Sequence, residues 1–229
     1  MLSVKLGQDR FHPISKTGSQ ISPDGVGWII VDSLDTLMIM NLTSKLEHAR
    51  QFVEHTLNYD QDQEVSVFET TIRMLGGLLS AHYLQDVLHM VPSDGKKDMY
   101  LEKATDLADR LLGSFDSPSG IPYASVNLRT REGKASHTDG GASSTAEAAT
   151  LQLELKYLAM LTGEALYWDK AAKVMEVLDK NNPQDGLVPI FVYAETGLYR
   201  GKEIRLGSRG DSYYGKPSHH PPWVPLYNF

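Results

Sequence analysis

The sequence contains no cysteine among its 229 residues. Without cysteine the chain has neither a disulfide framework nor a thiolate metal site. This absence says little about compartment, because secreted proteins without cystines exist. A hydrophobic core must therefore hold the fold together, and a content of 41% apolar residues is enough for one large domain or two small ones.

An excess of positive charge is also missing. The chain has 22 Lys and Arg residues against 29 Asp and Glu residues, which leaves a net charge of -7 and no basic stripe. Nucleic acid and anionic membrane surfaces are therefore poor candidate partners, since both select basic surfaces. A neutral polar ligand fits this balance better.

Long hydrophobic runs are absent as well. Residues 28–42 come nearest to a membrane span, but they are too few and include Asp32 and Asp35, whose charges are costly in hydrocarbon. The first residues contain no apolar stretch of the length that a signal peptide needs. We therefore predict no transmembrane segment and no targeting segment in this chain.

The sequence does contain a series of helical patterns. Their apolar periodicity predicts helices at 28–40, 44–57, 67–84, 99–112, 144–161 and 165–180. Gly113 and Gly163 stand where helices end. Residues 187–193 and 198–206, with Gly197 between them, predict a β-hairpin. The expected fold class is all-α, with about six helices and one hairpin.

The helix predicted at 67–84 is apolar around most of its circumference, yet it carries Glu69 and Arg73 one turn apart. A helix of this kind is normally buried, so we expect the charged pair to be buried too. Two interpretations remain open: an ordinary ion pair along the helix, or a pair that lines a functional pocket.

Two other helices carry acidic residues in similarly apolar surroundings. Asp32 lies in the first helix, where it or Ser33 could instead be an N-cap. Glu147 and Glu154 share one face of the helix at 144–161, although Ser144 and Glu147 also form a capping-box pattern. If these faces point inward, they line one acidic cavity suited to sugar hydroxyls or a hard cation. Paired carboxylates across a cleft are typical of glycoside hydrolases.

Two rival motifs fail. Residues 210–216 approach the phosphate-binding loop, but Pro217 replaces the hydroxyl residue that binds magnesium. Residues 60–64 begin like a calcium loop, but Val65 stands where that loop needs glycine.

Several ordered motifs together resemble glycoside hydrolase family 47, the class I α-1,2-mannosidases, in its fungal endoplasmic-reticulum type. The motifs are HPISKT (12–17), GWIIVDSLDTL (27–37), FETTIRMLGGLLSA (68–81), LQLEL (151–155), LTG (161–163) and LGSRGDSYY (206–214).

This resemblance implies a function and a cofactor. It implies an inverting hydrolase in an (α/α)7 barrel that trims terminal α-1,2-linked mannose from high-mannose N-glycans with Ca²⁺. Glu69 and Asp211 match catalytic carboxylates, and Glu69 is thought to act through a water. The residues that match substrate-binding positions of the barrel interior are Arg73, Arg209, Asp32 and Glu154. The endoplasmic reticulum or secretory pathway is the implied location.

The sequence also departs from the family pattern. Arg10 replaces an acidic residue of the substrate rim, and the pattern stops after Tyr214. About half of the barrel is then missing, with its general-base glutamate, its calcium-binding threonine and its cystine pair. We therefore predict a partial catalytic domain at 1–214, a divergent, disordered tail at 215–229, no metal site in this chain and no activity from it alone. A non-catalytic glycan binder or a partner-dependent half-barrel is the alternative.

Overall fold

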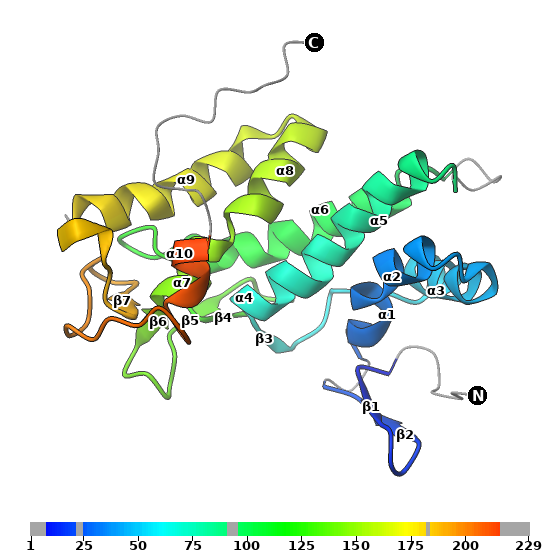
Figure 1. Ribbon diagram of the computed structural model, residues 1–229, viewed down its shortest axis with the longest axis horizontal. Helices are drawn as coiled ribbons and strands as arrows, with labels where there is room; N and C mark the ends of the chain where they lie inside the picture. Colours follow the sequence, from blue (N-terminus) through cyan, green and yellow to red (C-terminus); the bar gives the residue numbers. More distant parts are fainter. Residues whose placement is uncertain (1–7, 22–24, 91–95, 182–183, 216–229) are drawn as a thin grey trace.

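The computed structural model describes residues 8–21, 25–90, 96–181 and 184–215. Helices form most of it and lie in neighbouring pairs (Figure 1). The pairs are α5 (Gly76–Val87) with α6 (Met99–Leu111), α8 (Gln152–Thr162) with α9 (Ala165–Lys180), and α2 (Leu34–Ile39) with α3 (Thr43–His55). In Figure 1 α5 and α6 lie between the α8–α9 pair and the group α1 to α3.

The apolar faces of these helices meet in one core. The largest side chains that are fully buried in it include Tyr59, Tyr100, Leu34, Met74, Leu78, Leu107 and Leu111. Leu158 of α8 and Val174 of α9 are buried in the same core, so burial of apolar area joins the helix pairs into one unit.

Three of the predicted helices are interrupted. The segment 28–40 forms α1 (Trp28–Asp32) and α2, separated at Ser33, whose φ is -105°. The Ser33 hydroxyl donates to the carbonyl of Ile30 at 3.1 Å and makes no cap hydrogen bond. N-capping by Asp32 or Ser33 was therefore the wrong alternative here.

The other two interruptions have one feature in common. The segment 67–87 runs from α4 (Val67–Glu69) through a π-helical turn, η1 (Thr70–Leu75), into α5, while α7 (Thr145–Thr150) and α8 are separated at Leu151. In each, a threonine hydroxyl donates to the carbonyl four residues earlier: Thr71 to Val67 at 2.8 Å and Thr150 to Ala146 at 2.6 Å. Such bonds compete with the helical ladder and bend it.

Three small antiparallel sheets accompany the helices, and the sequence indicated only part of one of them. β1 (Arg10–His12) pairs with β2 (Thr17–Ser19), β4 (Ser125–Asn127) lies between β3 (Glu64–Ser66) and β5 (Gly133–Lys134), and β6 (Ala142–Ser144) pairs with β7 (Phe191–Tyr193). Strands of two or three residues leave almost no alternating pattern to read.

The predicted hairpin is confirmed in outline. Val192 pairs with Tyr199 and Pro189 with Ile204 in antiparallel bridges. Gly197, with φ of 72°, occupies the turn, where a left-handed backbone favours glycine. The structure adds a third strand, because β7 of the hairpin also pairs with β6.

The two glycines expected at helix ends behave differently. Gly163 caps α8 with φ of 73°, as predicted. Gly113 instead lies inside the short 3-10 helix η2 (Leu112–Phe115), where an added Cβ would come within 1.7 Å of the Arg131 carbonyl oxygen. The α-helix α6 does end just before Gly113, as predicted, and the close backbone approach adds a second requirement for glycine there.

Short helical elements complete the described fold. η3 (Gln184–Gly186) follows α9, and α10 (Asp211–Gly215) contacts α7. Apart from Gly215, the predicted tail lies outside the described residues. In the described residues, no helix combines the length and apolarity that crossing a membrane would require.

Candidate active site

Two helix starts are built alike and lie against each other. β3 leads into α4, and β6 leads into α7; in both cases the last strand residue is a serine and a glutamate follows three positions later. Ser66 Oγ accepts from the Glu69 amide and Ser144 Oγ accepts from the Glu147 amide, each at 3.3 Å. Because α4 contacts α7, these N-terminal turns bring two carboxylates to one region of the molecule.

Glu69 forms a charge cluster with two residues that the sequence analysis also selected. Arg73 Nε donates to Glu69 Oε2 at 2.7 Å, and Arg73 Nη1 lies 3.4 Å from Asp32 Oδ2. The hydrogen bond from Arg73 to Glu69, with the nearby negative charges, raises the pKa of Arg73 above its usual range.

The expected burial of this cluster was wrong. The Glu69 and Asp32 side chains are each 40% exposed and that of Arg73 is 42% exposed. The apolar residues on the same helix are buried as predicted, including Met74 and Leu75. The polar seam instead reaches solvent, because no described segment covers it.

The position of Asp32 depends on a close helix contact. A Cβ on Gly77 would lie 2.6 Å from the backbone oxygen of Val31, so only glycine lets α1 approach α5 this closely. Asp32 is the next residue after Val31, and this approach brings its carboxylate to Arg73. Glycine at 77 thus serves the geometry of the charge cluster.

Glu154 joins the same seam from α8. Its Cγ lies 3.8 Å from the position of a Cβ on Gly76, three residues beyond Arg73. That distance is ordinary van der Waals contact, so Glu154 packs against the helix at Gly76. Glu154 as a whole is of intermediate exposure, but its Oε2 atom is buried, in contrast to the open carboxylates of Glu69 and Asp32.

A hollow of about 290 Å³ opens beside Glu147. Asp211, at the start of α10, and Arg209 line it with Glu147. The complete lining is Phe68, Ser144, Ala146, Glu147, Ser208, Arg209, Asp211 and Ser212. Hydroxyl, carboxylate and guanidinium groups therefore surround a space large enough for a small polar ligand.

Burial raises the pKa of the Glu147 carboxyl above its ordinary value of 4.5. The positive charge of Arg209 opposes this shift, while the negative charges of Asp139, Glu69 and Asp211 add to it. Glu147 therefore retains a proton to a higher pH than an exposed glutamate would. Asp211 lines the hollow together with Glu147, whereas Glu69 does not.

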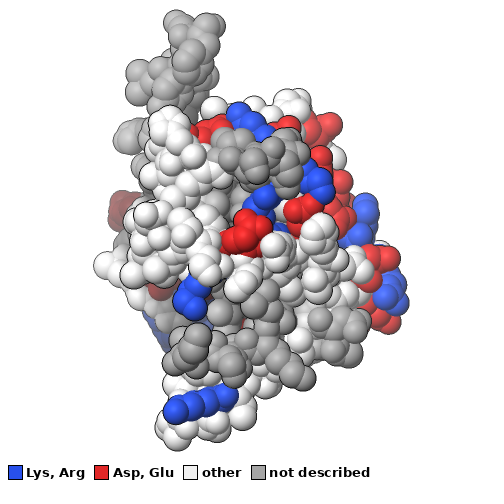
Figure 2. All heavy atoms as spheres, turned by 90° about the vertical axis from the view of Figure 1, so that its right-hand side faces the viewer, with Lys and Arg blue, Asp and Glu red and all other residues white. Residues whose placement is uncertain are grey.

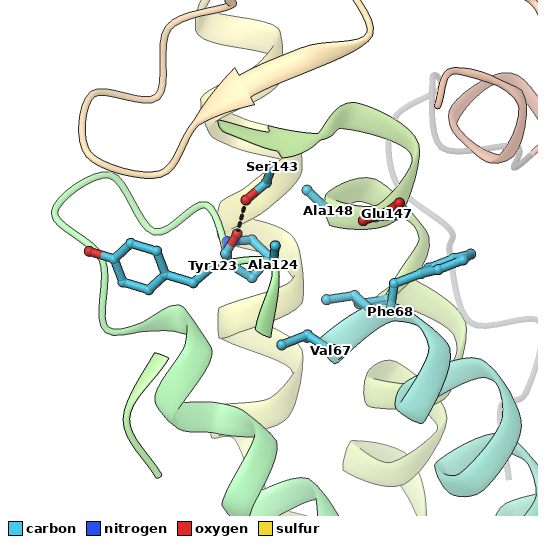
Figure 3. A pocket seen from close by; sticks show the side chains of 9 residues that line it. Val67, Phe68, Tyr123, Ala124, Ser143, Glu147 and Ala148 are labelled. Carbon is cyan, nitrogen blue, oxygen red and sulfur yellow. Dashed lines mark hydrogen bonds between the residues drawn. The ribbon is translucent and has the colours of Figure 1, made fainter. Parts of the chain in front are cut away.

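A second, water-sized void of about 10 Å³ lies behind Glu147 (Figure 3). Val67, Phe68 and Ala148 supply apolar walls, and Ser143 Oγ donates to the Pro122 carbonyl at 2.7 Å. Glu147 lines both spaces.

Glu147 is the residue that the sequence analysis undervalued. The capping interpretation is correct for its backbone amide, but its carboxyl group lines the hollow. The available signal was the repeated pattern of serine followed three residues later by glutamate, which occurs at Ser66 and at Ser144 directly before two of the predicted helices.

The face shown in Figure 2 mixes acidic and basic side chains in the same clusters, with an uncharged area beside them. No extended basic stripe crosses the described part of this face. Among the residues that the structure describes, no three His, Asp or Glu side chains are grouped closely enough to hold a metal ion. The described acidic side chains therefore do not form a carboxylate cluster of the kind that holds calcium.

Comparison with known proteins decides the family. Residues 3–216 match the sequence model of glycosyl hydrolase family 47. The chain belongs to this family. An α-1,2-mannosidase from Trichoderma reesei has the same fold, with a TM-score of 0.80 and 29% sequence identity over 92% of this chain and 44% of its own. The helix pairs are thus an incomplete α/α barrel, as predicted.

Curated family 47 relatives extend well beyond the match. A mannosyl-oligosaccharide 1,2-alpha-mannosidase of Candida albicans is 56% identical over 208 residues, which cover 91% of this chain and 35% of the relative. An endoplasmic reticulum mannosyl-oligosaccharide 1,2-alpha-mannosidase of Saccharomyces cerevisiae is 49% identical over 225 residues, which cover 91% of this chain and 40% of the relative. The chain thus spans 35% to 40% of these two proteins.

Proposed function

We propose that this chain is part of an inverting mannosyl-oligosaccharide 1,2-α-mannosidase that trims terminal α-1,2-linked mannose from high-mannose N-glycans. The names of the two fungal relatives support this activity. The observation that carries the proposal is the hollow where Glu147, Arg209 and Asp211 meet. Sugar hydroxyls can donate to the carboxylates and accept from the guanidinium, so the lining suits a neutral, hydroxyl-rich ligand.

In this proposal Glu69 and Asp211 are the catalytic carboxylates. Arg73 occupies Glu69 Oε2, so Glu69 would pass its proton through a water held at the other oxygen. Arg73, Arg209, Asp32 and Glu154 would bind sugar hydroxyls. Protonation of the leaving oxygen would proceed from this side of the glycosidic bond.

Glu147 adds a carboxyl group to this machinery. Burial raises its pKa, so the protonated form, which can donate a hydrogen bond or a proton to a sugar oxygen, persists to a higher pH than in an exposed glutamate. An ionised carboxylate can only accept hydrogen bonds and could not donate to a sugar oxygen. We therefore place Glu147 among the groups that contact the sugar.

Inversion also requires a base that activates water on the opposite face of the sugar. The resemblance assigns that base and the calcium-binding threonine to a part of the barrel beyond this sequence, so Ca²⁺ belongs to the proposal only for the whole enzyme. Loss of a positioned base costs a factor of ~10²–10⁴ in rate. We accordingly expect no measurable turnover from the 229-residue chain by itself.

The endoplasmic reticulum is the proposed location, since the relatives from Saccharomyces cerevisiae and Schizosaccharomyces pombe are named for it. The partial catalytic domain at 1–214 remains a prediction. A binding protein without turnover is the second candidate, and it is favoured by one observation: the hollow is present although the chain spans 35% to 40% of two relatives.

A chimera separates these functions. Residues 1–214 are fused to the remaining part of the Saccharomyces cerevisiae relative, and mannose release from a high-mannose oligosaccharide is measured with calcium present. We expect turnover from the chimera and its loss in Glu69→Gln. Glu195→Gln is the matched control, because Glu195 accepts from the Tyr123 hydroxyl outside the hollow.

Two outcomes contradict the proposal. A folded chimera that binds α-1,2-mannobiose without releasing mannose supports the binding function instead. Release by the 229-residue chain alone, abolished by Glu69→Gln, means that a carboxylate within this chain supplies the base and that the assigned roles are wrong.

A further inference from the structure

Arg209 has an unusual backbone. Its φ is 72°, a left-handed conformation that is uncommon for a residue with a Cβ. The Arg209 carbonyl accepts from the Ala146 amide at 2.9 Å, and a Cβ on the following Gly210 would lie 2.2 Å from the Arg205 carbonyl oxygen. The backbone is thereby tied to the start of α7, next to Glu147. Strain of this kind persists where surrounding contacts enforce it.

The Arg209 side chain is held by two residues from other segments. Its Nη1 donates to Asp139 Oδ2 at 3.1 Å, and its guanidinium lies 4.9 Å from the centroid of the Phe191 ring. The ring faces a second guanidinium, that of Arg200, at 5.4 Å. Arg200 also donates to the backbone carbonyl of Asp139. Phe191 and the two arginines thus join the loop containing Asp139 to β7.

Asp139 is itself fixed in place. Its side chain is 19% exposed, and Ser136 Oγ donates to Asp139 Oδ2 at 2.9 Å. Burial would raise the pKa of Asp139, but the Ser136 hydrogen bond and the charge of Arg209 outweigh burial and hold the pKa below its ordinary value. Asp139 is therefore a charged and oriented acceptor. It does not line the hollow.

We propose that Asp139 and Phe191 are positioning residues, which hold the Arg209 guanidinium at the hollow beside Glu147 and Asp211. A bidentate, planar donor is effective only in a defined orientation. Asp139 supplies a directional contact, and the Phe191 ring supplies a flat support. The consequence for sugar binding rests on the proposed function, while the positioning of Arg209 does not.

The direction in which the Glu147 pKa shifts can report whether Arg209 keeps its position. Arg209 lowers the pKa of Glu147, while Asp139 raises it. In Asp139→Asn, removal of the negative charge alone would lower the Glu147 pKa. If Arg209 also leaves its position, the loss of its positive charge raises the Glu147 pKa. The charge of Arg209 affects the Glu147 pKa more strongly than the charge of Asp139 does. If Arg209 leaves its position, the Glu147 pKa should therefore rise.

The test is a carboxyl-carbon NMR titration of Glu147 in the full chain. We expect the pKa of Glu147 to rise in Asp139→Asn. A fall shows that Arg209 keeps its position without Asp139 and overturns the role of Asp139. Glu195→Gln removes the same charge elsewhere and is the control, for which no change is expected.

Phe191→Leu is the second variant and keeps the net charge. We expect the Glu147 pKa to rise here too, because only the support of Arg209 is lost. An unchanged Glu147 pKa in this variant overturns the role of Phe191. This variant also keeps the proposal testable if Asp139→Asn fails to fold, which circular dichroism would reveal.

Binding of α-1,2-mannobiose to the same proteins separates this inference from the proposed function. If the wild-type chain binds it, we expect Asp139→Asn to weaken binding on the order of tenfold, as for loss of an oriented charged hydrogen bond. Unchanged affinity would overturn the effect on sugar binding. If the wild-type chain does not bind mannobiose, the binding role assigned to the hollow fails, and the titration still decides whether Arg209 is positioned.

Discussion

The two serine-capped helix starts have the same local design and different surroundings. Glu69 and Glu147 occupy equivalent positions after Ser66 and Ser144. Glu69 has Arg73 one turn further along its own helix, whereas Leu151 stands at that place after Glu147. The cation near Glu147 is Arg209, from a distant segment.

This difference separates two ways of controlling a carboxyl group. The cluster at Glu69 is open to solvent and paired with charge, so Coulomb attraction within a high-dielectric environment dominates. At Glu147 the loss of water is the largest influence, and it favours the neutral acid. One capping motif thus places two carboxyl groups in different surroundings, one exposed beside a cation and the other desolvated.

Of the variants that test this difference between Glu69 and Glu147, Gly77→Ala should have the largest effect. It disturbs the helix contact that supports the Glu69 charge cluster. The new Cβ would meet the Val31 backbone oxygen at 2.6 Å, and a backbone atom cannot move aside cheaply. We expect a loss of ~2–4 kcal/mol in the free energy of unfolding, typical of strong overpacking. Denaturant unfolding measures it.

Gly76→Ala is the matched control at the neighbouring position. Its Cβ would find its nearest neighbour at 3.6 Å, which is ordinary contact. Equal destabilisation by the two substitutions would contradict the role of the α1–α5 approach.

The two caps should also differ in strength. Ser144→Ala removes the acceptor for the Glu147 amide and a 3.4 Å contact to the Arg209 carbonyl, at a buried position. We expect a loss of about 1–2 kcal/mol, and a loss nearer 0.5–1 kcal/mol for Ser66→Ala. Denaturation curves compare the two variants, and a larger loss at Ser66 would reverse the proposed order.

A smaller effect is expected from the pH dependence of Glu147→Gln. The folded state raises the pKa of this acid, so the folded protein binds more protons and its stability falls as pH rises above about 4.5. The Glu147→Gln variant has no carboxyl group at this position, so it does not lose stability in this way as pH rises. We expect its Tm to exceed that of the wild type at pH 7 by no more than about 2 °C, because Glu147 is partly exposed.

Thermal scans from pH 4 to pH 7 test this prediction. The difference should shrink toward the acidic end, where Glu147 is largely protonated in both the folded and unfolded states. A variant that is less stable at pH 7 would show that the charged form is favoured by the fold.

The ion pair between Glu69 and Arg73 should have the smallest effect on stability. Exposed pairs one turn apart contribute ~0.2–0.5 kcal/mol. A double-mutant cycle of Glu69→Gln and Arg73→Met measures the coupling. A coupling above about 1.5 kcal/mol would mean that the pair is effectively desolvated, contrary to its 40% and 42% exposure.

Much of the helical part of the fold follows from sequence patterns. Apolar periodicity predicted the segments that form α3, α5, α6, α8 and α9, because amphipathic helices repeat over several turns. It did not predict the breaks at Ser33 and Leu151. Hydroxyl hydrogen bonds to backbone carbonyls accompany those breaks, and such bonds leave no periodic signal.

The candidate site shows the same division. Glu69 and Arg73 were recognisable because charge is unusual on an apolar helix, and Asp211 and Arg209 were recognisable from the family motif. Asp139 and Phe191 had no such signal. Their contacts with Arg209 join a loop, a strand and a helix start that are distant in sequence.

The sequence by itself determined the family, the helix order and the spacing that pairs Glu69 with Arg73. Only the tertiary structure decided that this pair faces solvent, that Glu147 is desolvated and that Arg209 is its nearby cation. The physical reason is the distance along the chain over which each property is set. Helical pairing is set by neighbours within one turn, while exposure and electrostatic surroundings depend on which distant segments pack against a residue.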